Sequence, residues 1–165
     1  MVYRKNTLVD FMEIEVVWFK KDLRVRDHTP LVNASNGGNP ILCLFIIEQE
    51  RFNLPDFDPI HIEWEIDCAK ELAKSLEKLG GSLHFEFGNA IEILERINSI
   101  HGVSRIHSHQ ETGNSWSYQR DIDVSNWCKA NNIEWIEYQN NGVIRNLDNR
   151  DNWKKQRDAR MRESN

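Results

Sequence analysis

Short apolar segments alternate along the chain with longer amphipathic segments. Ile14–Phe19 and Ile41–Ile47 are almost continuously apolar, which is typical of parallel strands covered on both faces. Leu83–Phe87 instead alternates apolar and polar residues, and this pattern predicts a strand at the edge of a sheet. Val103–Ser108 and Ile133–Tyr138 complete a set of five predicted strands.

A helix is predicted between the second and third strands. Asp58 and Pro59 are a suitable N-cap and first helical residue, and Gly80 and Gly81 end the periodic pattern. The inward face of this helix is predicted to contain Ile62, Trp64, Ile66, Ala69, Ala73 and Leu76.

Two further helices are predicted. Asn89 and Glu92 form a capping pair before an apolar stripe that ends at Gly102, and another helix is expected over about residues 115–129. Strands that alternate with helices form right-handed βαβ units. The expected fold is therefore α/β, with a three-layer, doubly wound (Rossmann-like) parallel sheet of five strands.

Composition narrows the class of protein. The chain has 165 residues, of which 39% are hydrophobic and 28% charged, as in an ordinary globular domain. The formal net charge of −5 argues against tight binding to nucleic acid by this chain alone. No apolar run approaches the roughly 20 residues of a membrane-spanning helix.

The N-terminus and the cysteines indicate the compartment. Acidic residues interrupt the N-terminal segment, so an export signal is not expected. Cys43, Cys68 and Cys128 are odd in number, far apart and within apolar patterns, which predicts core thiols in a reducing compartment. A cytoplasmic location is expected.

Charged residues follow the first strand directly. The segment VVWFKKDLRVRD, from Val16 to Asp27, changes from apolar to strongly charged after Phe19. In a doubly wound sheet, ligands bind at the carboxyl ends of strands where the strand order reverses. If the first strand is central, its end adjoins HSHQETGN, which runs from His107 to Asn114. A ligand crevice and a pair of solvated loops are both compatible with this pattern.

Several site signatures are absent from the sequence. There is no GxGxxG, GxxxxGK[ST] or GxSxG motif, so neither a phosphate-binding loop nor a hydrolase elbow is predicted. His107 and His109 are expected to be hydrogen-bonded at a strand end, and no metal site is predicted. Trp18, Trp64 and Trp127 are predicted to lie in the core. Trp116 and Trp153 have polar neighbours and are candidates for stacking on a flat ligand or a partner.

Three segments carry a resemblance to a known family. WFKKDLRVRDHTPL (Trp18–Leu31), ETGNSWSYQRDIDVSNW (Glu111–Trp127) and NNGVIRNLDNRDNWKKQRDARM (Asn140–Met161) resemble, in order and spacing, the N-terminal α/β domain of the DNA photolyase/cryptochrome family, in its bacterial cryptochrome-like branch. The resemblance implies the strand order 3-2-1-4-5, in agreement with an edge position for Leu83–Phe87.

The resemblance also implies a domain organisation. Residues 1–13 would be an N-terminal extension, residues 14–142 the α/β domain, and residues 143–165 a C-terminal helix leading to a helical FAD-binding domain that is absent from this chain. That domain would be a partner in cis or in trans, and DNA would be reached only through it. The chain alone is therefore expected not to repair pyrimidine dimers.

The family role of this domain is to hold an antenna chromophore, which is a folate, a deazaflavin, a lumazine or a flavin according to the member. The residues carried over as its binding site are Lys21, Asp22, Glu48, Glu111 and Asn114. The loop before Arg120 is longer than in well-known members, which leaves the choice of chromophore open. Without the covering domain, binding is expected to be micromolar at best or absent.

Two alternatives differ in the class of function. The chain can be a subunit of a light-driven deoxyribodipyrimidine photolyase completed by another chain, or a stand-alone nucleotide-binding α/β protein that uses the crevice for ATP. For Arg24 and Asp27 a role in loop structure, or in contacts with the missing domain, is favoured over a role in the crevice. The basic residues between Arg145 and Arg162 are interleaved with acids, which favours a solvated helix over a nucleic-acid surface.

Overall fold

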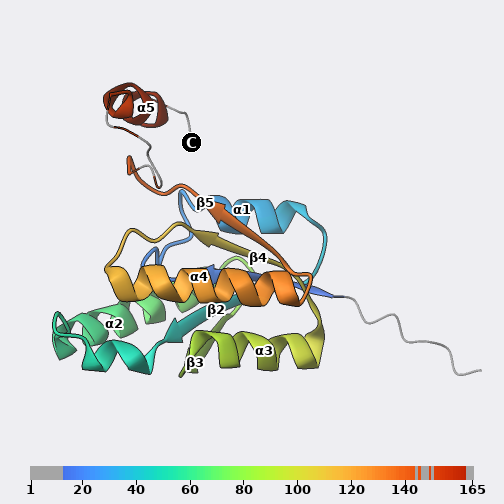
Figure 1. Cartoon of the computed structure of the whole chain (residues 1–165). Helices are drawn as coiled ribbons and strands as arrows, with labels where there is room; N and C mark the ends of the chain where they lie inside the picture. Colours follow the sequence, from blue (N-terminus) through green and yellow to red (C-terminus); the bar gives the residue numbers. More distant parts are fainter. Residues whose placement is uncertain (1–12, 144, 146–148, 150, 163–165) are drawn as a thin grey trace, which may run out of the picture.

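The computed structural model describes residues 13–143, 145, 149 and 151–162 of the chain (Figure 1). In this part of the chain, five parallel strands form one sheet in the order β3-β2-β1-β4-β5. The strands are β1 (Ile14–Phe19), β2 (Ile41–Ile47), β3 (Leu83–Phe87), β4 (Val103–His109) and β5 (Glu134–Tyr138). The strand order and the edge position of β3 confirm the predictions.

Helices cover both faces of the sheet. They are α1 (Thr29–Asn36), the 3₁₀ helix η1 (Gln49–Asn53), α2 (Pro59–Glu77), α3 (Ala90–His101), α4 (Ser115–Ala130) and α5 (Trp153–Arg160). α1 and α2 pack on one face and α3 and α4 on the other. The capping predictions hold: Asp58 accepts a hydrogen bond from the N–H of Ile60, and Asn89 accepts hydrogen bonds from the N–H groups of Ile91 and Glu92.

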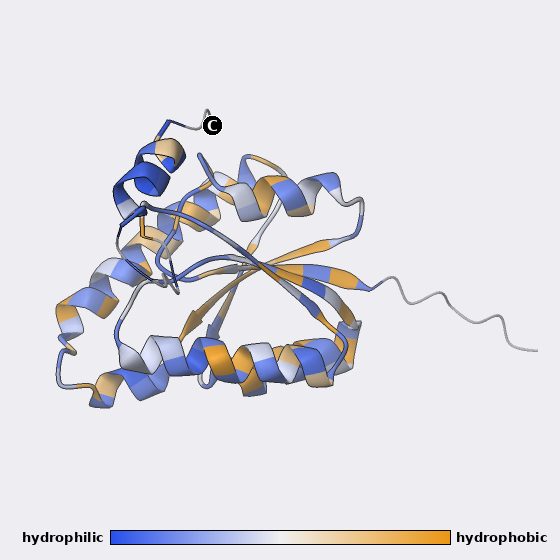
Figure 2. Cartoon of the chain, turned by 45° about the horizontal axis from the view of Figure 1, so that its top comes forward, coloured by the Kyte–Doolittle hydropathy of each residue, from blue (hydrophilic) through white to orange (hydrophobic). Residues whose placement is uncertain are grey.

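The central strands form the core. Residues 15–20 are all buried, and so are residues 43–48 of the neighbouring segment, which explains why these strands are apolar on both faces. Figure 2 shows the hydrophobic residues concentrated in the sheet and on the inward sides of the helices. Trp18 is buried as predicted, and Trp127 is partly buried against the core. Cys43 and Cys128 are buried free thiols, whereas Cys68 is only half-buried.

Trp64 is not in the core, and its prediction was wrong. The side chains of α2 that are fully buried belong to Ala69, Leu72 and Leu76, and Leu72 was missing from the predicted face. Because each helical residue turns by about 100°, Trp64 lies about 140° around the helix from Ala69. Trp64 is accordingly 72% exposed.

The polar residues of β4 are accommodated by a buried hydrogen-bonded chain. Glu15 is fully buried, and its carboxylate lies 2.8 Å from Nε2 of His107. Nδ1 of the same ring lies 2.9 Å from the hydroxyl of Tyr138. Asn39 and Arg105 bond to the other oxygen of Glu15. The predicted hydrogen-bonded role of His107 is thereby confirmed.

The C-terminal segment with α5 differs from the rest of the chain in position and in polarity. α5 stands apart from the layered body in Figure 1 and is mostly hydrophilic in Figure 2. The guanidinium group of Arg145 links this segment to the body through Glu137, at 3.0 Å, and Asp121, at 3.1 Å. None of the described helices has the length and hydropathy needed to cross a membrane.

The loop after β1 is held by Arg24. Its guanidinium group donates to the backbone carbonyl groups of Arg26 and Asp27 and to the side chain of Asn140. Asp27 has a positive φ of 50°, which the two hydrogen bonds in this loop help to hold. The favoured structural role of Arg24 is consistent with these contacts.

Candidate functional site

A cavity of about 400 Å³ lies at the carboxyl ends of β1, β2 and β4. The N-terminal part of α2 and the first turns of α4 form its sides. This is the edge of the sheet where a doubly wound fold presents its ligand site, because the strand order reverses between β1 and β4.

Four of the five residues carried over from the resemblance line this cavity. They are Lys21, Glu48, Glu111 and Asn114. Asp22 does not line it, because the side chain of Asp22 is buried among two histidines on the other side of the loop.

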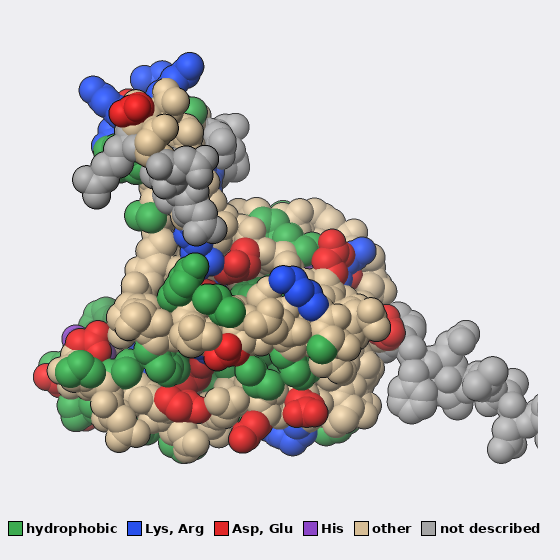
Figure 3. Space-filling model, viewed as in Figure 1, with side chains coloured by type: hydrophobic (Ala, Val, Ile, Leu, Met, Phe, Trp, Pro, Cys, Tyr) green, Lys and Arg blue, Asp and Glu red, His purple; other side chains and the backbone are tan. Residues whose placement is uncertain are grey.

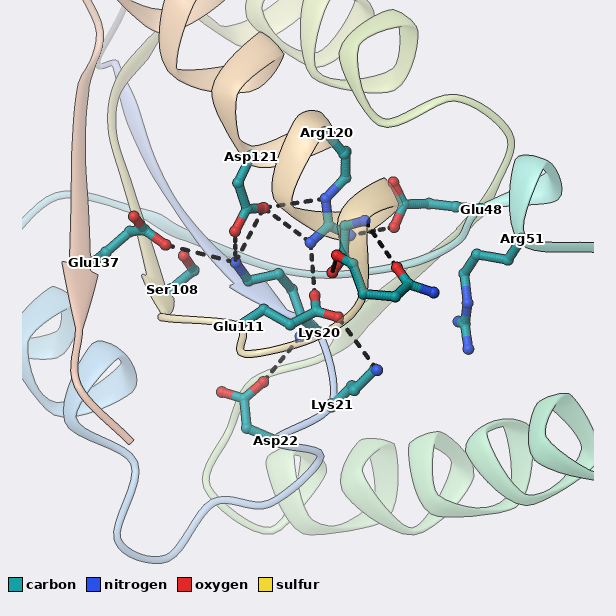
Figure 4. Close-up of polar contacts among 12 residues, drawn as sticks. Lys20, Lys21, Asp22, Glu48, Arg51, Ser108, Glu111, Arg120, Asp121 and Glu137 are labelled. Atoms are coloured by element: carbon teal, nitrogen blue, oxygen red, sulfur yellow. Dashed lines mark hydrogen bonds and ion pairs between the residues drawn. The ribbon is translucent and has the colours of Figure 1, made fainter. Parts of the chain in front are cut away.

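Arg120, from the second turn of α4, is the centre of the polar network in Figure 4. Its guanidinium group donates to the carboxylates of Glu48 and Glu111, the latter at 2.6 Å. It also bonds to Asp121 at 2.9 Å. Burial alone would lower the pKa of Arg120, but Glu48 and Glu111 hold it above its ordinary value. Arg120 therefore stays charged and fixes two carboxylates at the wall of the cavity.

The two carboxylates respond differently to burial. Burial raises the pKa of Glu48 to about 7, and Arg120 offsets this effect only in part. Burial would also raise the pKa of Glu111, but Arg120 and Lys20 hold it below the ordinary value. Near neutral pH the carboxylate of Glu111 is thus ionised and that of Glu48 is partly protonated.

Lys20 is a buried cation beneath the cavity. Its side chain is 4% exposed, and its ammonium group lies 3.4 Å from Asp121 and 3.8 Å from Glu137. The ammonium group also lies 5.2 Å from the ring centre of Trp18 and 5.5 Å from that of Trp135. Burial lowers the pKa of Lys20, while the carboxylates and the ring faces stabilise its charge.

Three tryptophans contribute to the lining of the cavity: Trp18, Trp64 and Trp116. The guanidinium carbon of Arg120 lies 5.0 Å from the ring centre of Trp18 and 5.4 Å from that of Trp116. Trp116, a predicted candidate for stacking, lines the cavity, and Trp64 contributes an aromatic surface there instead of packing in the core. Flat aromatic surfaces of this kind favour a flat ligand.

Each cation among the described lining residues is already paired with a carboxylate. The ammonium group of Lys21 lies 3.3 Å from Glu111, and Arg51 makes two 2.7 Å bonds to Glu65. Lys20 and Arg120 are also paired with carboxylates. The positive charge that a polyphosphate would need is therefore already neutralised by the protein.

Asp22 accepts hydrogen bonds from two buried histidines. Its Oδ2 atom lies 2.7 Å from Nε2 of His28 and 2.5 Å from Nδ1 of His109. Burial would raise the pKa of Asp22, but the hydrogen bonds from His109 and His28 hold it well below its ordinary value. The nitrogen and oxygen atoms of this trio lie within 4.8 Å of one another, a spacing that a metal ion can bridge.

The tautomer of His28 argues against a metal ion in this trio. Nδ1 of His28 accepts the N–H of Leu31 at the start of α1, so the ring proton is on Nε2 and points to Asp22. A metal ion would have to displace that proton and disrupt the N-cap. The trio therefore serves to anchor the loop after β1 to α1 and β4.

The central role of Arg120 was not predicted, although the polar residues beside it on the inward face of α4 indicate a polar site. The buried residues of α4 are Ser117, Asp121, Val124 and Cys128, which share one helical stripe. The polar members lie toward the N-terminus of α4, next to the cavity. A stripe that changes from apolar to polar toward the carboxyl ends of the strands is the pattern to look for.

Comparison with known proteins gives one family. The DNA photolyase family model matches residues 15–162. Cryptochrome DASH from Gloeobacter violaceus is 26% identical over 116 residues, covering 67% of this chain and 23% of the relative. A deoxyribodipyrimidine photo-lyase from Agrobacterium fabrum is 34% identical over 92 residues, covering 55% of this chain and 18% of the relative.

Solved structures agree with this assignment. The Synechocystis cryptochrome has a TM-score of 0.71 at 23% identity and covers 77% of this chain, which spans 27% of that structure. The archaeal photolyase from Sulfolobus tokodaii, described with two FAD molecules, has a TM-score of 0.69 at 25% identity, with coverage of 79% and 30%. The chain thus spans less than a third of each of these relatives. It belongs to the DNA photolyase family and corresponds to the N-terminal α/β domain of its photolyases and cryptochromes.

Proposed function

We propose that the cavity binds an aromatic antenna chromophore for a photolyase-like or cryptochrome-like flavoprotein. The observation that carries this proposal is the position of three tryptophans, and of the two carboxylates held by Arg120, around one cavity at the carboxyl ends of β1, β2 and β4. Its volume of about 400 Å³ lies within the usual range for small-molecule sites.

The hydrogen-bond acceptors at the cavity wall suit a ligand whose heterocyclic ring is uncharged and carries N–H groups. Glu111 would accept a hydrogen bond from the ligand, and Glu48 would accept or donate one according to its protonation. The ring faces of Trp64 and Trp116 would cover the ligand, and Asn114 would contribute at the rim. The bound chromophore would absorb light and pass on its excitation energy.

The family relationship supports a second domain as the recipient of that energy. The Sulfolobus tokodaii photolyase is described with two FAD molecules and a light-harvesting cofactor. A helical FAD-binding domain, in the same polypeptide or in another chain, would supply the redox chemistry and the contact with DNA.

The surface around the cavity supports the same partner. Phe52, Ile60 and Trp64 are 38%, 63% and 72% exposed, and Figure 3 shows hydrophobic side chains gathered over η1 and the N-terminal part of α2. A second domain would bury these side chains.

The pairing of the cations separates the proposal from the ATP alternative. ATP needs cations for its phosphates, whereas Lys20, Lys21, Arg51 and Arg120 are each bound to carboxylates. The observations therefore favour a heterocycle without a polyphosphate chain. A photolyase assembled from two chains would use the same cavity.

Equilibrium dialysis of the purified chain with riboflavin, folinic acid and ATP tests the proposal. We expect one or both of the heterocycles to bind with a dissociation constant of about 1 to 100 µM, because the cavity is open on one side. ATP should bind at least about tenfold more weakly. Preference for ATP, or no binding of either heterocycle at millimolar concentration, would contradict the proposal.

A further inference from the structure

The outer side of β3 is an open sheet edge. Within the described part of the chain, β3 pairs with β2 and has no strand on its other side. Side chains on both of its faces are accessible: the side chain of His84 is 45% exposed, and Phe85 and Phe87 are 41% and 60% exposed. Arg96 of α3 and Phe52 of η1 contact side chains of β3, but no described strand pairs with its outer backbone groups, so another strand can add there.

The sequence of β3, LHFEF, complements itself in an antiparallel arrangement. When two copies are paired about a two-fold axis at Phe85, Phe85 lies opposite Phe85 of the other copy. Leu83 lies opposite Phe87 of the other copy on the same face, so six apolar side chains form one continuous row. On the other face, His84 lies opposite Glu86 of the other copy in both halves of the pair.

We propose that a second copy of this chain pairs with β3 edge to edge and extends the sheet to ten strands. A two-fold interface requires that one surface patch complement itself. β3 meets this condition, because histidine and carboxylate side chains face each other on one side of the paired strands and apolar side chains face each other on the other side. A randomly composed edge would place like charges or a polar and an apolar residue opposite each other. β3 residues do not line the cavity, so this inference is independent of the proposed chromophore site.

The charges of the edge are compatible with pairing. Glu86 bonds to His84 at 2.6 Å and to Arg96 at 2.8 Å within one chain. In the dimer Arg96 would still neutralise Glu86, while His84 would gain a second carboxylate across the axis. A strand of five residues buries less than the interface of a permanent dimer, so the association should be reversible and depend on concentration.

Sedimentation velocity from about 5 to about 500 µM tests the inference. The wild-type chain should shift from monomer to dimer within this range. Phe85→Lys places two like charges at the axis and should keep the chain monomeric, and His84→Glu should weaken the dimer about tenfold. Ile122→Lys is the matched control, because Ile122 is an exposed residue (37%) of α4 and its replacement should not affect dimerisation.

Cysteine cross-linking tests the register directly. Phe85→Cys brings two thiols together at the axis and should yield a covalent dimer on mild oxidation. Phe87→Cys places the thiol opposite Leu83 and should cross-link at least about tenfold more slowly; the wild-type chain, with its three native thiols, is the blank. A wild type that stays monomeric, a dimer that persists in Phe85→Lys, or faster cross-linking through Phe87→Cys would overturn the proposal.

Discussion

Two buried polar clusters, one at the carboxyl ends of the strands and one within the sheet, differ in what their carboxylates face. In the cavity cluster, Arg120 holds Glu48 and Glu111, and all three residues line the cavity. In the sheet cluster, Glu15 is enclosed by His107 and by other protein donors, and neither residue lines the cavity. Burial of charge by itself therefore does not indicate a binding site.

The difference lies in which carboxylates face open space. Glu15 is fully buried and both of its oxygens have donors from the protein, so this cluster has little capacity for a ligand. Glu111 also has a partner at each oxygen, Arg120 and the 60% exposed Lys21, but Glu111 and Glu48 line the cavity. Because a carboxylate oxygen can accept more than one hydrogen bond, an N–H donor of a ligand in the cavity can bind there. We therefore assign a structural role to the sheet cluster and a binding role to the cavity cluster.

The largest expected effect comes from removal of the shared cation. Arg120→Met leaves Glu48, Glu111 and Asp121 buried without their common partner, and we expect a loss of about 3 to 5 kcal/mol in the free energy of unfolding, as measured with urea. Arg51→Met, which affects one partly exposed pair, is the control and should cost only about 1 kcal/mol. A loss for Arg120→Met that is no larger than that of the control would contradict the shared role.

The raised pKa of Glu48 should make the cavity cluster sensitive to pH. Between pH 4.5 and about 7, the folded chain keeps a proton on Glu48 that the unfolded chain has released. The free energy of unfolding should therefore fall as the pH rises through this window, by at most about 3.5 kcal/mol. Glu48→Gln, measured in parallel, should remove this slope, and an unchanged slope would mean that another group is responsible.

Asp22 should have the opposite effect on the free energy of unfolding, which should fall as the pH decreases, and in a lower pH range than Glu48. Its pKa is lowered from the ordinary 3.8, so its stabilising contribution is complete above that pH and is lost as the pH falls below it. Asp22→Asn should therefore flatten the acid limb of the stability curve and leave the slope above pH 4.5 in place. A change in the upper slope would contradict the separation of the two groups.

A smaller effect is expected from the sheet cluster. Glu15→Gln retains the shape of the side chain but loses the charge that accepts from His107 and Arg105, at a cost of about 2 kcal/mol in the free energy of unfolding. Urea unfolding near neutral pH measures this cost. A variant as stable as the wild type would show that the charge of Glu15 contributes nothing to the sheet.

The fold could be predicted from the sequence because it depends on local patterns. The apolar runs of β1 and β2 fix two central strands, and the alternation in Leu83–Phe87 identifies the edge. Boundaries were close: β4 ends one residue later and β5 begins one residue later than expected. These features depend on neighbouring residues and need no knowledge of distant contacts.

The site was harder to predict because it joins distant residues. Arg120 and Glu48 are 72 positions apart, and no local pattern specifies their contact. Asp22 was grouped with Lys21, yet the side chains of these neighbours are directed to opposite sides, toward the buried histidines and toward the cavity. Trp64 was assigned to the core from its spacing, although its position around α2 exposes it to the cavity. The missing information was the direction in which a side chain points, around a helix for Trp64 and after a strand for Lys21 and Asp22.

Titration of the tighter-binding heterocycle, riboflavin or folinic acid, into the wild type and two variants tests the central claim most directly. Glu111→Ala removes an acceptor from the cavity wall while Arg120 keeps two other carboxylates, so binding should weaken about tenfold in a folded protein. Glu15→Gln should leave the dissociation constant unchanged, although it destabilises the sheet. Equal affinity in wild type and Glu111→Ala, or weaker binding in Glu15→Gln than in Glu111→Ala, would contradict the assignment of binding to the cavity cluster.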